Sequence, residues 1–180
     1  MGSFFSVPST LVERNRNKSA HAALMIWAWG VFIPSAVMLA SLRSKDNVAL
    51  GAEPPFWFFS HRSLAYAGVI MAAAATMIGR AVATGSDRAS SHRFVGYATM
   101  LLGLAQPIIA YVRPKTAEEK EKTGWLKLHR YVGWLSTALA LVNIRLGLQL
   151  WDPHNAISST YYAGLVSAGS LALAWNYKNF

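Results

Sequence analysis

Four of the five histidines in this 180-residue chain stand at the start of long apolar segments: His21, His61, His92 and His129. Successive membrane-spanning helices run in opposite directions, so the starts of segments one and three lie at one membrane face and those of segments two and four at the other. This places His21 with His92, and His61 with His129. Two imidazoles at each face are what two irons with paired axial nitrogen ligands require, so the spacing predicts two bis-histidine haem sites.

Two other roles for paired histidines fit this spacing less well. Zinc takes about four ligands in one tetrahedral sphere, whereas these histidines divide between two faces and have no obvious carboxylate partners. Proton relays usually place ionisable groups through the middle of the membrane. An iron with both axial positions filled cannot readily bind a substrate, so we expect the pairs to serve electron transfer. The fifth histidine, His154, follows Asp152-Pro153 and is interpreted as a surface residue.

The elements that carry the histidines are predicted from runs without charge. Apolar residues make up 53% of the chain and charged residues only 14%, against about a quarter in soluble domains. A membrane helix needs roughly 20 mostly apolar residues. We therefore predict an all-α membrane protein, a bundle of five transmembrane helices of which four carry the histidines. The helices are expected at about residues 19–42, 57–82, 90–113, 125–151 and 156–176.

The domain organisation that follows is simple. Residues 1–19 are polar and are predicted to form a poorly ordered N-terminal arm, and residues 20–177 to form one transmembrane domain without a soluble catalytic module. Pro34 is expected to kink the first helix, and Ser90 or Ser91 to cap the third. The absence of cysteine excludes disulfides, thiol catalysis and thiolate-ligated iron.

The net charge of +9 is interpreted as contact with the lipid bilayer and not with nucleic acid, because the basic residues are scattered among short loops beside the spans. More of them lie at the face of His61 and His129, which also has the charged loop 114–124. By the positive-inside rule that face is cytosolic. The N-terminus is then non-cytosolic and the C-terminus cytosolic.

Glycines recur one helical turn after two of the histidines. Gly96 lies four residues after His92, and Gly133 lies four residues after His129. Residues at this spacing share a helix face, so the missing side chains are expected to let a flat macrocycle lie against the helix. Close helix–helix packing, which also favours small residues in membranes, is the alternative.

Polar residues recur fourteen residues after three of the histidines, at Ser35, Gln106 and Asn143. Fourteen residues is close to a whole number of turns, so these side chains share the histidine face near the far end of each helix. Polar groups in lipid usually face the bundle interior. We expect Gln106 and Asn143 to line the pocket of the opposite haem, with ordinary interhelical hydrogen bonding as the alternative.

Basic residues near the predicted sites are candidates for contact with anions. Arg145 interrupts the fourth span and is expected either to pair with a haem propionate or to snorkel to the headgroups. At the other face, Arg62 and Arg130 each directly follow a histidine, and Lys127 precedes His129 by two residues. These three are expected to form a patch that attracts an anionic reductant, with helix anchoring as the alternative.

The chain resembles the cytochrome b561 family over about residues 20–150, especially the core of its DOMON-linked members. The matching motifs surround the four histidines: His21-Ala22-Ala23-Leu24-Met25, Ala28-Trp29-Gly30, Trp57-Phe58-Phe59-Ser60-His61-Arg62, His92-Arg93 with Gly96, and Trp125-Leu126-Lys127-Leu128-His129-Arg130 with Gly133. The resemblance implies two haem b groups, one on His21 and His92 and the other on His61 and His129. It also implies a membrane oxidoreductase that takes electrons from a cytosolic donor such as ascorbate. The acceptor would be ferric iron, a ferric chelate, monodehydroascorbate or a redox protein.

The sequence departs from the family pattern in three places. Ala22 stands where glycine is usual, no DOMON domain precedes the spans, and Ser60-His61-Arg62-Ser63 differs from the motif of the ascorbate-reducing members. The last two departures leave the donor and acceptor open. A membrane protein without redox activity, such as a small-ligand carrier or an assembly subunit, is the alternative function. Formation of a homodimer is also left open.

Overall fold

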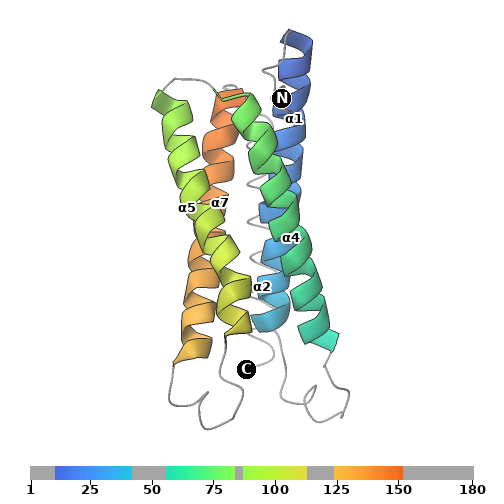
Figure 1. The fold of residues 1–180 in the computed structure, drawn as a ribbon, viewed down its shortest axis with the longest axis vertical. Helices are drawn as coiled ribbons and strands as arrows, with labels where there is room; N and C mark the ends of the chain where they lie inside the picture. The colour runs from blue at the N-terminus through green and yellow to red at the C-terminus, as the bar shows by residue number, and fades with distance from the viewer. Residues whose placement is uncertain (1–10, 42–55, 84–86, 113–123, 152–180) are drawn as a thin grey trace, which may run out of the picture.

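Four long helices make up the part of the chain that the computed structural model describes, residues 11–41, 56–83, 87–112 and 124–151 (Figure 1). The first helix is continuous but changes type twice along its length. In chain order the elements are α1 (Leu11–Met25), the π-helix η1 (Ile26–Phe32), α2 (Ile33–Ser41), α4 (Phe56–Ala81), α5 (Asp87–Tyr111) and α7 (Trp125–Trp151).

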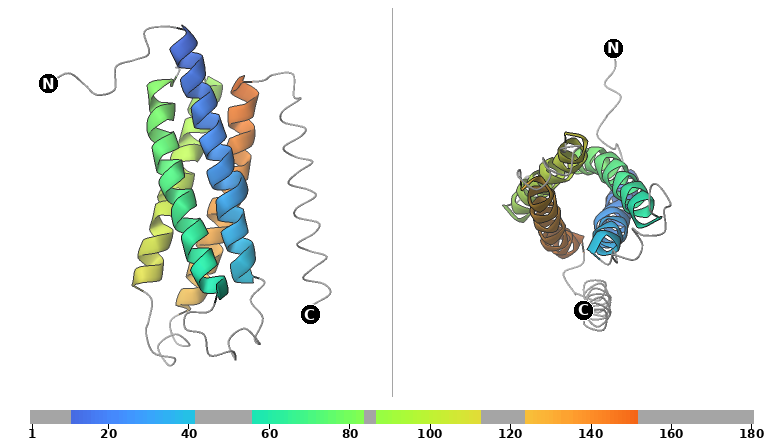
Figure 2. Two further views of the ribbon diagram at one scale, coloured as in Figure 1. Left: turned by 90° about the vertical axis from the view of Figure 1, so that its right-hand side faces the viewer. Right: turned by 90° about the horizontal axis from the view of Figure 1, so that it is seen from below.

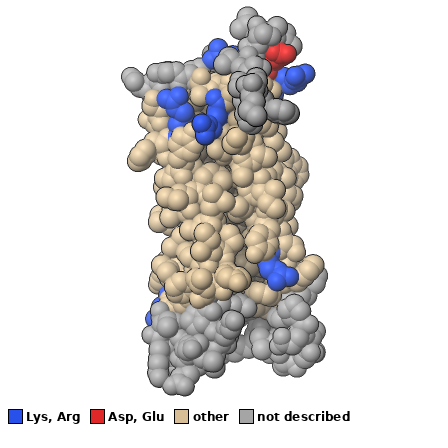
Figure 3. Space-filling model, in the orientation of Figure 1, with Lys and Arg blue, Asp and Glu red and all other residues tan. Residues whose placement is uncertain are grey.

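Each of the four helices is long and apolar enough to cross a membrane. Their outer faces carry large apolar side chains, and Ile70, Phe94 and Leu101 are 68%, 77% and 71% exposed. In the face shown in Figure 3, Lys and Arg gather at the two ends and leave an uncharged band between them. A surface of this kind is stable in hydrocarbon, where helices satisfy their own backbone hydrogen bonds.

The helices associate as two antiparallel pairs. The long first helix packs along α4, and α5 packs along α7, whereas contacts from one pair to the other are fewer. Seen end-on, the four helices follow one another around a ring (Figure 2). The starts of α1 and α5 lie at one end of the bundle, and the starts of α4 and α7 at the other (Figure 1).

The centre of the bundle is packed around Trp29 of η1, which is 3% exposed. It belongs to one buried cluster with Ala28, Ile33, Ala72, Met100, Ala140, Ile144 and Leu148. The indole reaches α5 at Gly103, where an added Cβ would lie 2.7 Å from Trp29 Cη2. The missing side chain at Gly103 therefore lets an aromatic ring from one helix pair reach the other.

The helix boundaries agree with the sequence in two cases and differ in two. Helices α4 and α7 lie where they were predicted. The first helix begins at Leu11 and not near Ser19, because a helix can continue past the hydrocarbon into the headgroup region. Helix α5 begins at Asp87, so the predicted cap at Ser90 or Ser91 is wrong, and Ser90 Oγ accepts a hydrogen bond from Arg93 at 3.0 Å.

Two other predictions concern the number of spans and the effect of Pro34. The expected fifth helix at residues 156–176, together with His154, lies outside the described residues, and four spans are found within them. A π-helix precedes Pro34, and Ile33 N–H donates to Ala28 O, five residues back, while the kink at Pro34 stays a prediction. A π-helix holds more residues per turn than an α-helix, so residues after η1 are displaced in register.

Replacing Gly103 by alanine is expected to lower the free energy of unfolding by about 1–3 kcal/mol, because the new methyl group overpacks the core against Trp29. Thermal unfolding in detergent measures the loss. In the Gly103→Ala background, Trp29→Phe removes the ring atoms that collide and should restore part of the stability. Simple additivity of the two losses would show that the contact does not couple these positions.

Candidate functional site

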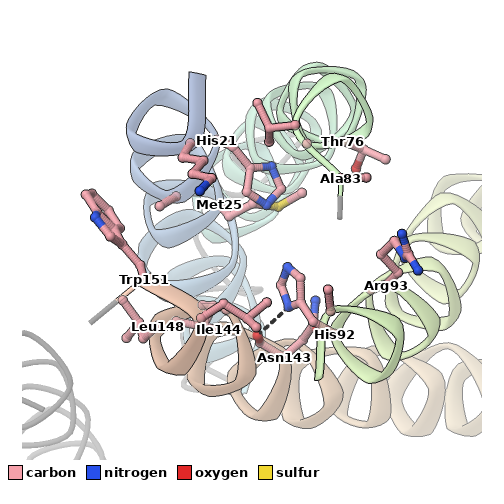
Figure 4. Close-up of a pocket in the computed structure, with 18 of the residues that line it drawn as sticks. His21, Met25, Thr76, Ala83, His92, Arg93, Asn143, Ile144, Leu148 and Trp151 are labelled. Carbon is pink, nitrogen blue, oxygen red and sulfur yellow. Dashed lines mark hydrogen bonds between the residues drawn. The ribbon is translucent and has the colours of Figure 1, made fainter. Parts of the chain in front are cut away.

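The four predicted histidines meet as two pairs at opposite ends of the bundle. The ring centroids of His21 and His92 are 6.1 Å apart, and those of His61 and His129 are 6.3 Å apart. The ring planes are nearly perpendicular in both pairs, at 89° and 81°. In Figure 4 the rings of His21 and His92 project toward each other into one pocket. Each pair joins one helix of the first antiparallel pair to one helix of the second.

The orientation of three rings is fixed by hydrogen bonds from Nδ1 to a backbone carbonyl: His21 to Ala75 O at 2.7 Å, His61 to Ala36 O at 2.8 Å, and His92 to Asn143 O at 3.1 Å. A carbonyl oxygen can only accept, so Nδ1 carries the proton in each case. Nε2 of the neutral ring then has a free lone pair. This is the usual arrangement of a metal-binding histidine, whose other ring nitrogen is held by an acceptor.

The separation within each pair suits one metal ion bound by both rings. Two metal–imidazole bonds of about 2 Å each, together with the distance from each nitrogen to its ring centre, add to about 6 Å. Within the described helices no group of three or more His, Cys, Asp or Glu residues could hold a metal. The chain thus offers two ligands per site, and a prosthetic group such as a porphyrin would supply the others.

A cavity of about 640 Å³ surrounds His21 and His92 and is lined by all four helices (Figure 4). This volume falls in the range of small-molecule and cofactor pockets. Its walls include the apolar side chains of Met25, Ile26, Trp29, Met100, Ile144 and Leu148, and the cations of Lys18, Arg80 and Arg93. Apolar walls with cations suit a flat macrocycle that carries carboxylates, so the residues present fit a haem.

Two glycines that were not among the predicted site residues allow the rings of this site to approach neighbouring helices. A Cβ at Gly79 would lie 2.6 Å from His21 Nδ1 and Cε1, and a Cβ at Gly147 would lie 2.9 Å from His92 Cε1. Each glycine follows a histidine of its own helix by eighteen residues, which is five turns. That spacing is the signal that could have found them.

The predicted glycines and amides face one another between α5 and α7. A Cβ at Gly96 would lie 2.9 Å from Asn143 Nδ2, and a Cβ at Gly133 would lie 3.6 Å from Gln106 Oε1. Asn143 lies beside His92 and lines its cavity, and one amide atom of Gln106 lies 2.8 Å from His129 Nδ1. Each amide thus lies at the site opposite to the histidine of its own helix. The contact of a macrocycle with Gly96 and Gly133 stays a prediction.

The choice between a haem propionate and the headgroups as the partner of Arg145 stays a prediction. Arg145 is exposed on α7 and is not among the residues that line the cavity. The cations that do line it are Lys18, Arg80 and Arg93. Each lies within three residues of His21, Gly79 or His92, and this closeness in sequence was the available signal.

The predicted basic patch lies at the other end of the bundle. Arg62, Lys127 and Arg130 are all exposed, near the starts of α4 and α7. The guanidinium of Arg62 lies 5.8 Å from the centre of the Phe58 ring, within the range of a cation–π contact. The three side chains are therefore accessible at the end of the bundle that carries His61 and His129.

A family model for eukaryotic cytochrome b561 matches residues 20–152, which include all four paired histidines. The chain belongs to this family. It is 28% identical to a cytochrome b561 and DOMON domain-containing protein of Arabidopsis thaliana, over 89% of this chain and 39% of that protein. It is 30% identical to ferric-chelate reductase 1 of Mus musculus, over 73% of this chain and 22% of that protein. No solved structure matches the chain.

The chain spans less than half the length of these relatives. Membership of the family, with four membrane-spanning helices, supports haem-dependent electron transfer by an integral membrane protein. The glycine contacts then make a prediction about the His21 and His92 site.

Gly79→Ala and Gly147→Ala are each expected to weaken haem binding at this site by about 10- to 100-fold, since the methyl group displaces a ring whose other contacts are fixed. Haem b bound per chain, measured as the pyridine haemochrome during titration, checks this. The haem held by His61 and His129 in the same variants is the internal control, because the atoms nearest to the added Cβ belong to His21 at position 79 and to His92 at position 147. Equal retention of the two haems in both variants would show that the two glycines do not position the rings.

Proposed function

We propose that this cytochrome b561 carries electrons across a membrane through two b haems. His21 and His92 would bind one haem, and His61 and His129 the other. The observation that carries the proposal is the pair of ring separations, 6.1 and 6.3 Å, at opposite ends of one bundle. A single metal site or a ligand carrier would not require this duplicated arrangement.

The two pairs would hold their cofactors in a form suited to electron transfer. A bound haem supplies an iron that changes between the ferric and ferrous states and so carries one electron at a time. His21 with His92, and His61 with His129, would each hold one haem from both sides, so that the bound group would exchange electrons and would not bind a substrate. The cations Lys18, Arg80 and Arg93 line the first site, where they would stabilise propionate groups that would otherwise be buried without a partner.

The length of the helices separates the two sites along the membrane normal. Gln106 contacts His129 and follows His92 on α5 by fourteen residues, which corresponds to about 21 Å of helix. The hydrocarbon core is about 30 Å thick. Each site would therefore lie near one membrane surface, within reach of a donor or acceptor on that side.

The donor side is proposed from charge. The face with His61 and His129 has the larger number of basic residues, which makes it cytosolic by the positive-inside rule. Exposed Arg62, Lys127 and Arg130 would attract an anion such as ascorbate to this face. Ascorbate would give up one electron, release one proton to water on that face, and become monodehydroascorbate. On the other side a ferric chelate would accept the electron, and Fe(III) would become Fe(II).

The purified protein is expected to bind two b haems per chain noncovalently, with each histidine pair responsible for one. His21→Ala and His92→Ala should deplete one component of the dithionite-reduced spectrum, and His61→Ala and His129→Ala the other. The pyridine haemochrome gives the stoichiometry. One haem per chain, or loss of the same component from His21→Ala and His61→Ala, would contradict the two-site assignment.

Lys127→Ala and Arg130→Ala are expected to slow reduction by ascorbate about tenfold at low salt without changing haem content, because the anion is no longer attracted to that face. The measurement uses vesicles that contain the protein and an enclosed ferric chelate, with ascorbate added outside. Arg16→Ala, an exposed residue at the other end of the bundle, is the matched control. Rates that respond neither to these changes nor to added salt would assign the residues to helix anchoring.

A further inference from the structure

The fourth histidine has a side chain beside its Nδ1 atom. The Nδ1 atoms of His21, His61 and His92 donate to backbone carbonyls. Beside His129 Nδ1 there is a side chain, and one amide atom of Gln106 lies 2.8 Å away. Substitution cannot remove a backbone carbonyl, but it can remove an amide. Replacing Gln106 would therefore change the group beside Nδ1 of one histidine and leave the carbonyl partners of the other three in place.

We infer that Gln106 is a positioning residue for the His61 and His129 site, where its amide oxygen accepts a hydrogen bond from Nδ1–H of His129 and so lowers the reduction potential of that haem alone. This inference rests on the proposed function, since it requires His129 to bind iron through Nε2. An acceptor on Nδ1–H makes the imidazole a stronger electron donor to the metal. Stronger donation favours the ferric state, and second-shell hydrogen bonding is a known control of haem potential.

The surroundings of the Gln106 amide offer it two orientations. The atom near His129 Nδ1 is also 3.1 Å from His129 O, and the other amide atom is 3.2 Å from Gly133 N. With nitrogen toward the ring, the amide donates to Nδ1 and to His129 O while its oxygen accepts from Gly133 N–H. The proton of the neutral ring is then on Nε2, which is unavailable to iron. With oxygen toward the ring, the amide accepts from Nδ1–H and leaves Nε2 free, while its oxygen also faces His129 O and its NH2 group faces Gly133 N–H without a hydrogen bond. Iron binding by His129 through Nε2 requires this second orientation, in spite of those two unfavourable contacts.

The adjacent turn of α7 leaves space beside the Gln106 amide. The neighbouring position on α7 is Gly133, whose absent Cβ would lie 3.6 Å from Gln106 Oε1. A larger residue at position 133 would occupy the space beside the amide. The turn of α7 that carries the ligand is therefore also the turn that accommodates its partner.

The test compares Gln106→Met with Gln106→Glu in the purified, haem-loaded protein. Methionine keeps the length of the side chain but offers no comparable acceptor, whereas glutamate keeps an oxygen at the same reach. Spectroelectrochemical titration gives the potential of each haem, and electron paramagnetic resonance of the ferric protein reports the ligand field at each site. Gln149→Met, at an exposed position of α7, is the matched control for the chemical change.

Gln106→Met is expected to raise the potential of the His61 and His129 haem, by about tenfold in the reduction equilibrium constant or about 59 mV for one electron. Gln106→Glu should give a potential at or below that of the wild type. The other haem and the Gln149→Met variant should be unchanged. If methionine causes loss of this haem alone and glutamate retains it, the acceptor role is also supported.

Three results would overturn the inference: unshifted potentials in Gln106→Met, equal shifts of both haems, or the same shift with methionine and glutamate. Loss of the haem from both variants would assign Gln106 to packing alone. All of these outcomes assume that the wild-type protein binds two haems. A wild type with fewer than two haems would instead contradict the proposed function, so the two failures are distinguishable.

Discussion

The contact between each imidazole and the neighbouring helix of its own antiparallel pair is the interaction on which both sites depend. His21 on α1 donates to Ala75 on α4, and His92 on α5 donates to Asn143 on α7. The ring-to-ring contacts, in contrast, cross from one pair to the other. Each helix pair therefore orients its own ligands, and a cofactor held between two rings would join the pairs where direct helix contacts are few.

Much of this arrangement follows from helix geometry, and the spacing of residues in the sequence is enough to predict that part. The four histidines, and the fourteen-residue spacing to Gln106 and Asn143, indicated which ends of which helices meet. The same spacing from His21 leads to Ser35, yet the carbonyl that holds His61 belongs to Ala36. The π-helix accounts for this displacement, because η1 inserts an additional residue before α2. Periodicity alone assumes a uniform helix and could not predict it.

The features that sequence reasoning missed depend on which neighbour faces a residue. Gly79 matters because the His21 ring lies against it, a contact between α1 and α4. Arg145 drew attention because it interrupts an apolar run, whereas the cations that line the cavity include Arg80 and Arg93, which lie near helix ends outside such a run. A polar residue in a span identifies an interior face only when its side chain cannot reach the headgroups. Long arginine side chains do not meet that condition.

The fourteen-residue interval also constrains how the length of these helices can change. On α5, for example, His92 stands at the start and Gln106, beside His129, stands near the end. A single inserted or deleted residue between them would rotate one by about 100° relative to the other, and one of the two sites would lose a side chain. Insertions and deletions should therefore be confined to the loops, unless the helix absorbs the extra residue locally as a wider turn. The π-helix at Ile26–Phe32 has this form.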